Sequence, residues 1–215
     1  MRHAWILIVA ALIGGCVANT PKPARKVDLA GSCASRIEEL KRMPLLFPPP
    51  VVDGKAAKPA GFREYADWAH CLQSDGARIP AAMFELQKVT LPAKLTLVLQ
   101  AGGQGTLAAA VSLLDDDMQV MRRYPFQQFV QRSSTYTLDA FLNPADAKVR
   151  YVLITPDSLD LGRNETHFTT NSSTVTVPIA TGGLFFFTIN SEGKIVNNFT
   201  DAGRLMINVR PASIL

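Results

Sequence analysis

The sequence predicts an all-β protein, a β-sandwich or jelly roll preceded by a short helical and proline-rich N-terminal segment. From Met83 onward, short segments alternate apolar and polar residues, as in 95–99 and 205–209. This period of two is typical of strands with one buried face. Turn sequences separate the segments, among them the acidic tip 115–117 and the predicted hairpin loop 191–194. Regular short strands with such turns favour a sandwich or jelly roll.

Nine strands are expected in this domain. In chain order they are 83–91, 95–101, 107–114, 119–124, 134–141, 149–155, 174–179, 184–190 and 205–210. Hydrophobic residues make up 47% of the chain, which is enough to form a core between two sheets.

The N-terminus has the features of a bacterial lipoprotein signal. Arg2 precedes an apolar run over 6–13. This run is too short for the roughly 20 residues of a membrane-spanning helix, but it fits the apolar region of a signal peptide. Two glycines then precede Cys16, and the segment 13–16 resembles the lipobox of bacterial lipoproteins. This predicts cleavage before Cys16 and lipid (palmitate) on its thiol; the alternative is an ordinary secretory signal with a chance cysteine.

The lipobox also predicts the location of the protein. Residues 1–15 form the signal peptide, and 16–32 form a tether from the membrane. Val17 stands where an Asp commonly retains enteric lipoproteins at the inner membrane, which favours the outer membrane and its periplasmic face. Three basic residues of the tether either lie against anionic headgroups or are solvated; they are Lys22, Arg25 and Lys26.

Two cysteines remain once Cys16 is assigned to lipid. In an oxidising periplasm, Cys33 and Cys71 are expected to form a disulfide bond. A cross-linked loop of this length stabilises the fold by roughly 4 kcal/mol on the chain-entropy account.

The segment 33–80 is predicted to be an N-terminal helix and loop region ahead of the sandwich domain, 81–215. Residues 35–43 form a helix candidate with Ser35 as N-cap, and a proline follows it. Four further prolines mark 45–61 as a loop or extended connector. Residues 62–72 are ambiguous between a short helix and an irregular segment.

Four segments resemble a known family. They are 92–99 (PAKLTLVL), 111–118 (VSLLDDDM), 149–155 (VRYVLIT) and 182–187 (GGLFFF). In order and spacing they are similar to strand and turn motifs of the maltose operon periplasmic protein family, here in a lipoprotein form. The likeness covers roughly 83–195 and implies a periplasmic β-sandwich linked to carbohydrate transport. Unlike the enteric members, this chain has a lipobox and a cysteine pair, and it lacks their proline- and alanine-rich linker and helical tail.

No catalytic, metal-binding or cofactor-binding residue is predicted. Motifs of nucleophilic hydrolases, zinc proteases and phosphate loops are absent from the sequence. His70 and His167 are interpreted as surface or structural residues, and a solvated turn is favoured over a calcium site at 115–117. The formal charge of +4, with scattered basic residues, does not favour nucleic acid as a partner.

A sugar site would need exposed aromatic rings with polar neighbours. Tyr65 and Trp68 lie three residues apart and would share one face of a helix, so they are the speculative ligand-binding residues; core packing is the alternative.

Two functions follow as hypotheses. The first is a non-enzymatic, periplasm-facing envelope lipoprotein accessory to carbohydrate transport, with an oligosaccharide as ligand. The second is a structural or assembly lipoprotein that docks on an envelope protein complex through an exposed strand edge or aromatic patch. A hydrolase is the least favoured hypothesis.

Overall fold

The computed structural model describes residues 23–46, 51–52, 55–56, 61–87, 89–102, 105–178 and 184–212. Strands make up 56% of the chain, and each helical element of the described part is a 3-10 turn of three residues. The predicted all-β class is therefore confirmed. No described helix is long and apolar enough to cross a membrane.

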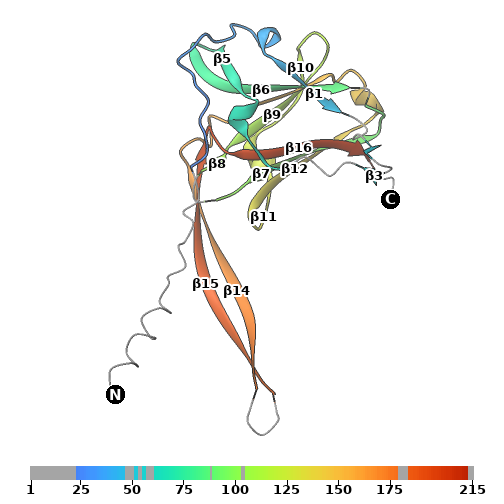
Figure 1. Cartoon of the computed structure of the whole chain (residues 1–215). Coiled ribbons are helices and arrows are strands. Elements are labelled where there is room, and N and C mark those ends of the chain that lie inside the picture. The colour runs from blue at the N-terminus through green and yellow to red at the C-terminus, as the bar shows by residue number, and fades with distance from the viewer. Residues whose placement is uncertain are drawn as a thin grey trace, which may run out of the picture.

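Two sheets form the body of the molecule (Figure 1). The first contains, in spatial order, β1 (Arg42–Leu46), β6 (Ala77–Gln87), β13 (Tyr151–Pro156), β9 (Ala109–Leu114) and β10 (Val120–Tyr124), with β5 (His70–Ser74) also paired to β6. The second contains β11 (Val130–Arg132), β12 (Thr135–Leu142), β7 (Ala93–Gln100), β16 (Arg204–Pro211) and β4 (Arg63–Glu64). A short separate ladder joins β2 (Val51–Val52) to β3 (Lys55–Ala56).

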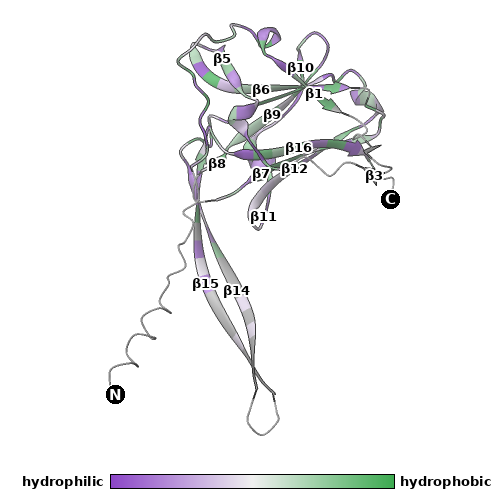
Figure 2. Ribbon diagram, in the orientation of Figure 1, coloured by the Kyte–Doolittle hydropathy of each residue, from purple (hydrophilic) through white to green (hydrophobic). Residues whose placement is uncertain are grey.

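The core lies between these sheets. Along β7, buried residues alternate with half-buried ones, and Leu95, Leu97 and Leu99 are at most 1% exposed. They belong to one cluster with Phe84 and Val111 of the first sheet. The predicted period of two is thus the pattern of the core. Figure 2 shows hydrophobic and hydrophilic segments mixed along the strands of the body.

The first sheet is buried on both faces. A second, smaller cluster covers its outer face, where Leu40 and Leu72 pack with Leu114 and Tyr151. Strand β13 has four consecutive buried residues as a result.

The expected N-terminal helix over 35–43 is wrong. Only Ile37–Glu39 forms a 3-10 turn, and β1 follows it and pairs in parallel with β6. Arg36 is the N-cap of this turn, and the backbone N–H of Ser35, the predicted N-cap, donates to Glu39 Oε2 at 2.8 Å. Only the last two residues of the predicted helix, Arg42 and Met43, lie in β1, where pairing with β6 takes the place of helical hydrogen bonds.

The boundary at residue 81 also differs from the structure. Residues 62–72 contain a 3-10 turn, Tyr65–Asp67, followed by β5. Strand β6 begins at Ala77, and β1, β4 and β5 all belong to the sheets of the sandwich. The segment 33–80 is therefore part of the same core instead of a separate helix and loop region.

A long two-stranded ribbon projects from the body (Figure 1). It consists of β14 (Asn164–Pro178) and β15 (Leu184–Thr200), which pair in one unbroken antiparallel register. We call this ribbon the arm. The predicted hairpin loop at 191–194 is wrong, because these residues lie inside β15 and pair with β14. At about 3.4 Å per residue, the 15 residues of β14 span about 50 Å.

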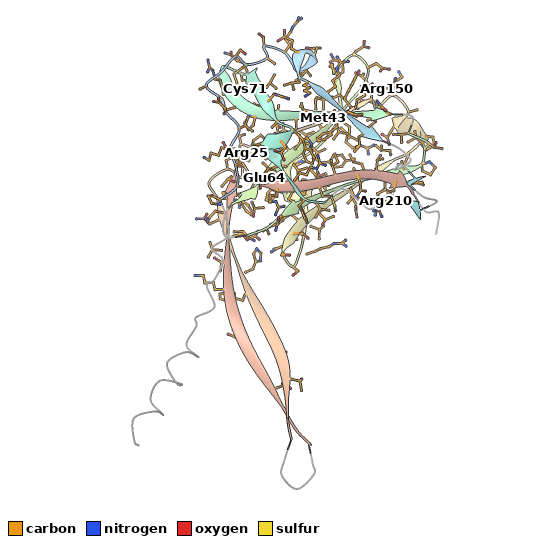
Figure 3. The ribbon with its side chains drawn as sticks, in the orientation of Figure 1. Arg25, Met43, Glu64, Cys71, Arg150 and Arg210 are labelled. Carbon is orange, nitrogen blue, oxygen red and sulfur yellow. A yellow bond between two sulfur atoms is a disulfide. The ribbon has the colours of Figure 1, made fainter. Side chains whose placement is uncertain are left out.

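The arm joins the body at one end only. There, Phe199 and Thr200 of β15 pair in parallel with β8 (Thr106–Leu107). Figure 3 shows side chains filling the space between the two sheets above this junction.

Candidate functional site

A cavity of about 390 Å³ opens where the arm meets the body. Its volume lies within the range of small-molecule sites, roughly 300–1,000 Å³. Aromatic and polar side chains line it: Phe126, Gln127, Phe129, Gln131, Tyr136, Asp160, Arg163, Asn164, Glu165 and Phe199.

The aromatic wall of this cavity is one packed cluster. Phe126 lies at its centre, with ring centroids 4.8 Å from Phe199, 5.2 Å from Tyr136 and 5.7 Å from Phe129. All four rings are at most 7% exposed, so they line the cavity from within the core. Contacts of this kind between aromatic rings stabilise the cluster beyond simple burial.

Two buried aspartates hold the wall in place. Phe126 begins the 3-10 turn η4 (Phe126–Gln128), and its backbone N–H donates to Asp157 Oδ2 at 2.9 Å. Asp160 is 2% exposed; it accepts a bond from Arg163 Nη1 at 2.6 Å and another from the Gln127 amide. Both carboxylates therefore position the turn that carries the aromatic wall.

A polar network lies beside the aromatic wall and centres on Tyr136. The hydroxyl of Tyr136 donates to Glu165 Oε2 at 2.7 Å and accepts from Asn197 Nδ2 at 3.1 Å. His167 Nε2 lies 3.4 Å from the same hydroxyl and 3.3 Å from Glu165 Oε2. The network forms because Glu165 and Asn197 are register partners at the root of the arm, while Tyr136 reaches them from β12.

Burial keeps the Tyr136 phenol protonated. Desolvation raises the pKa of Tyr136, and the hydrogen bond to Glu165 raises it further, whereas the bond from Asn197 lowers it. Tyr136 is consequently a fixed hydrogen-bond donor to Glu165 and not a base.

The network contains unused hydrogen-bonding capacity. Asn197 is 1% exposed, and its Oδ1 has no hydrogen-bond partner among the described residues. A buried polar atom without a partner costs about 1–3 kcal/mol, and such atoms in native structures call for an explanation.

A larger hollow of about 770 Å³ surrounds the crossing of the N-terminal segment over β5. Its lining contains no Phe, Tyr or Trp, and it includes His70 and both cysteines of the disulfide. It lacks the cluster of large aromatic rings found in the other cavity, so we place the candidate site at the root of the arm.

The structure corrects the ligand-binding role predicted for Tyr65. Its side chain is fully buried; the hydroxyl lies 2.8 Å from the carbonyl oxygen of Ile154 and 3.0 Å from that of Pro80. Trp68 is half-buried and packs edge-on against Phe84, with centroids 5.5 Å apart. Neither residue lines the cavity, and core packing is the outcome for both.

The predicted disulfide between Cys33 and Cys71 is present. Cys16 lies outside the described residues, so its lipidation stays a prediction. His70 is exposed, whereas His167 belongs to the Tyr136 network. The described residues hold no cluster of His, Cys, Asp or Glu arranged for a metal ion.

Sequence reasoning missed Tyr136, Glu165 and Asn197. They come from three strands, and 61 positions separate Tyr136 from Asn197. No local spacing motif connects residues that meet only through strand pairing, so a single sequence holds no signal for them.

No family model, curated protein or solved structure matches the chain. The resemblance to the maltose operon periplasmic protein family stays a prediction.

Proposed function

We propose that the protein is a non-enzymatic envelope lipoprotein that faces the periplasm and binds a small polyhydroxylated ligand, of the oligosaccharide class, at the root of the arm. The observation that carries this proposal is the cavity that combines the aromatic wall with the Tyr136 network. A role accessory to carbohydrate transport, as the family resemblance implies, is part of the same proposal.

The chemistry of the lining supports a sugar better than an apolar or a strongly charged ligand. Sugars pack their C–H groups against aromatic side chains and direct their hydroxyls to carboxylate and amide groups. The cavity provides Phe129 for the first and Gln131, Asn164 and Glu165 for the second. Because Arg163 is held by Asp160, the rim presents no isolated positive charge.

A shift in thermal midpoint on addition of ligand tests the proposal. The mature chain with Cys16→Ser would be screened with maltodextrins and other oligosaccharides at millimolar concentrations. A ligand that binds only the folded state raises the midpoint in a dose-dependent way. We expect one sugar class to do so, and no shift across the panel would overturn direct binding in that range.

Two variants and one control locate the site. Glu165→Gln removes a charged acceptor, and Tyr136→Phe removes the hydroxyl that holds Glu165, so both should abolish the shift. Lys148→Ala changes an exposed residue that does not line the cavity and should leave the shift intact. A shift that survives in both site variants would place binding elsewhere.

Lipid attachment is tested separately. Metabolic labelling with a palmitate analogue should mark the wild-type protein but not Cys16→Ser, and the wild type should fractionate with the outer membrane. An unlabelled, soluble wild-type protein would overturn the anchor and leave the sugar assay unaffected.

A second candidate function is docking on an envelope protein complex. The specific observation is the open edge of the first sheet at β10, where Val120 is 58% exposed and Met121 is 40% exposed. An edge strand with exposed apolar side chains is suited to pair with an extended segment of a partner. A photo-crosslinking residue at Val120 should give a discrete adduct in cells, while the same residue at Lys148 should not.

A further inference from the structure

The distal part of the arm carries no charge. From Phe168 to Ser191 the sequence contains no Asp, Glu, Lys, Arg or His, although charged residues flank the run on both sides. We call residues 168–178 and 184–191 the distal arm. Phe168 at its start is 78% exposed, which is the highest exposure among the large hydrophobic residues of the described chain.

The register of the arm divides its residues between two faces. Val175 pairs with Phe187 and Val177 with Phe185, and residues two positions apart along a strand share a face. The same face continues through Ser173–Ile189, Asn171–Ser191 and Thr169–Gly193, so it contains no charged position. We call it the uncharged face.

The opposite face is different in character. Over the outer part of the arm it holds four uncharged pairs, Ser172–Asn190, Thr174–Thr188, Thr176–Phe186 and Pro178–Leu184, most of whose positions are polar. Nearer the body it holds Thr170–Glu192 and Phe168–Lys194. Glu192 and Lys194, the first charged residues of β15 beyond the distal arm, therefore lie on this opposite face. The ribbon is amphipathic, with apolar positions concentrated on one side.

The tether joins the body at the root of the arm. Arg25 forms an ion pair with Asp67, and its backbone N–H donates to Glu64 Oε2 at 3.3 Å. Lys26 Nζ lies 3.7 Å from Asp201, the residue that follows β15. Figure 3 shows Arg25 and Glu64 together above the arm.

This placement limits how far the arm can be from a membrane that holds Cys16. Arg25 lies nine positions after Cys16, a stretch that spans at most about 30 Å when fully extended. The arm is about 50 Å long and starts at the same end of the body. A molecule anchored through Cys16 therefore has the distal arm within reach of its own bilayer.

We infer that the uncharged face of the distal arm binds the surface of a lipid bilayer, with the ribbon lying in the interface. The inference rests on the proposed lipid anchor for its geometry. Apart from their pairing with each other, the strands of the arm pair with one further strand of the described chain, β8, so most of both outer edges is open. Open edges are not tolerated in the hydrocarbon core, but headgroups and water satisfy them at the interface. The ribbon is therefore expected to lie flat along the bilayer surface instead of crossing it.

Vesicle flotation of a chain without lipid tests this inference independently of the anchor. The mature chain with Cys16→Ser would be mixed with vesicles of phosphatidylcholine. Because the face is uncharged, we expect flotation that does not weaken with added salt and does not require anionic lipid. No flotation of this chain would overturn the inference.

A matched pair of variants tests which face binds. Phe187→Asp places a charge on the uncharged face and should lower the vesicle partition coefficient about tenfold or more. Phe186→Asp places the same charge one residue away on the opposite face and should lower it less than about threefold. An equal loss in both variants would overturn the flat orientation.

Two further measurements distinguish the remaining outcomes. Both variants should retain the thermal midpoint of the body, so a loss of binding is not a loss of folding. If sedimentation instead shows a dimer that Phe187→Asp dissociates, and vesicles bind no protein, the face belongs to a second copy of the chain and the inference fails. Failure of palmitate labelling alone would remove the anchor while the vesicle result stands.

Discussion

The body and the arm are built from strands of the same kind but are held together differently. In the body, β7 has a paired strand on each side and a second sheet across the core, and Leu99 is fully buried. In the arm, each strand has one neighbour along most of its length, and Phe168 is 78% exposed. The two longest described strands therefore lie outside both sheets of the body.

This difference shows that strand length and stability are separate properties. A hairpin register is local, so a ribbon can extend as long as its two strands pair. An isolated hairpin is only marginally stable in water because it buries little apolar surface. We conclude that the free energy of folding resides in the body, which leaves the arm available for contact with other surfaces.

Removing the disulfide should have the largest effect on the body. The bond joins Cys33 to Cys71 across 38 positions, and its loss frees a long loop in the unfolded chain. For Cys33→Ala combined with Cys71→Ala, we expect the free energy of unfolding to fall by about 4 kcal/mol. Urea unfolding measures this change; a loss below about 1 kcal/mol would show that the sandwich alone holds the N-terminal segment.

Truncating a core leucine should have the next largest effect. Leu99→Ala opens a cavity between the sheets and should lower the free energy of unfolding by about 3 kcal/mol. Phe168→Ala removes a larger side chain from the arm but should change it by less than about 0.5 kcal/mol. Similar losses from both variants in urea unfolding would contradict the division between body and arm.

Alkaline pH should weaken the body through its buried tyrosines. Burial raises the pKa of Tyr65 and of Tyr136, so both keep their protons in the folded protein where the unfolded chain has lost them. Stability is thus fully present below the ordinary pKa of about 10 and falls above it, by about 1.4 kcal/mol per pH unit for each tyrosine. Urea unfolding across this pH range measures the slope. Tyr136→Phe should make it shallower, and an unchanged slope would argue that Tyr136 ionises freely in the fold.

Shortening the arm should have the smallest effect on stability. Replacing 167–195 by an Asn-Gly turn joins the register partners Thr166 and Val196 and retains Glu165 and Asn197. We expect the midpoint of urea unfolding to be unchanged within the equivalent of about 1 kcal/mol, while vesicle binding is lost. A large loss of stability would show that the arm supports the body.

The register of the long strands and the location of the site were not predictable from the sequence. The turn expected at 191–194 lies in β15 because fifteen consecutive register pairs outweigh the local preference of a glycine for a turn. The end of the predicted N-terminal helix shows the same effect, since Arg42 and Met43 pair with β6 in β1, which no local pattern indicates. Tertiary pairing overrides a weak local propensity in both cases.

The sequence by itself determined the all-β class and the cysteine pair. The alternation along β7 is a local period that any buried strand face imposes. Of the three cysteines, the prediction reserved Cys16 for lipid, which left Cys33 and Cys71 as one pair, and the structure contains that pair. Only the tertiary structure decided that Tyr65 is core, that Tyr136 meets Glu165 and Asn197, and that the tether enters beside the arm. Those features depend on contacts between residues far apart in the chain, and periodicity carries no information about which distant strands become neighbours.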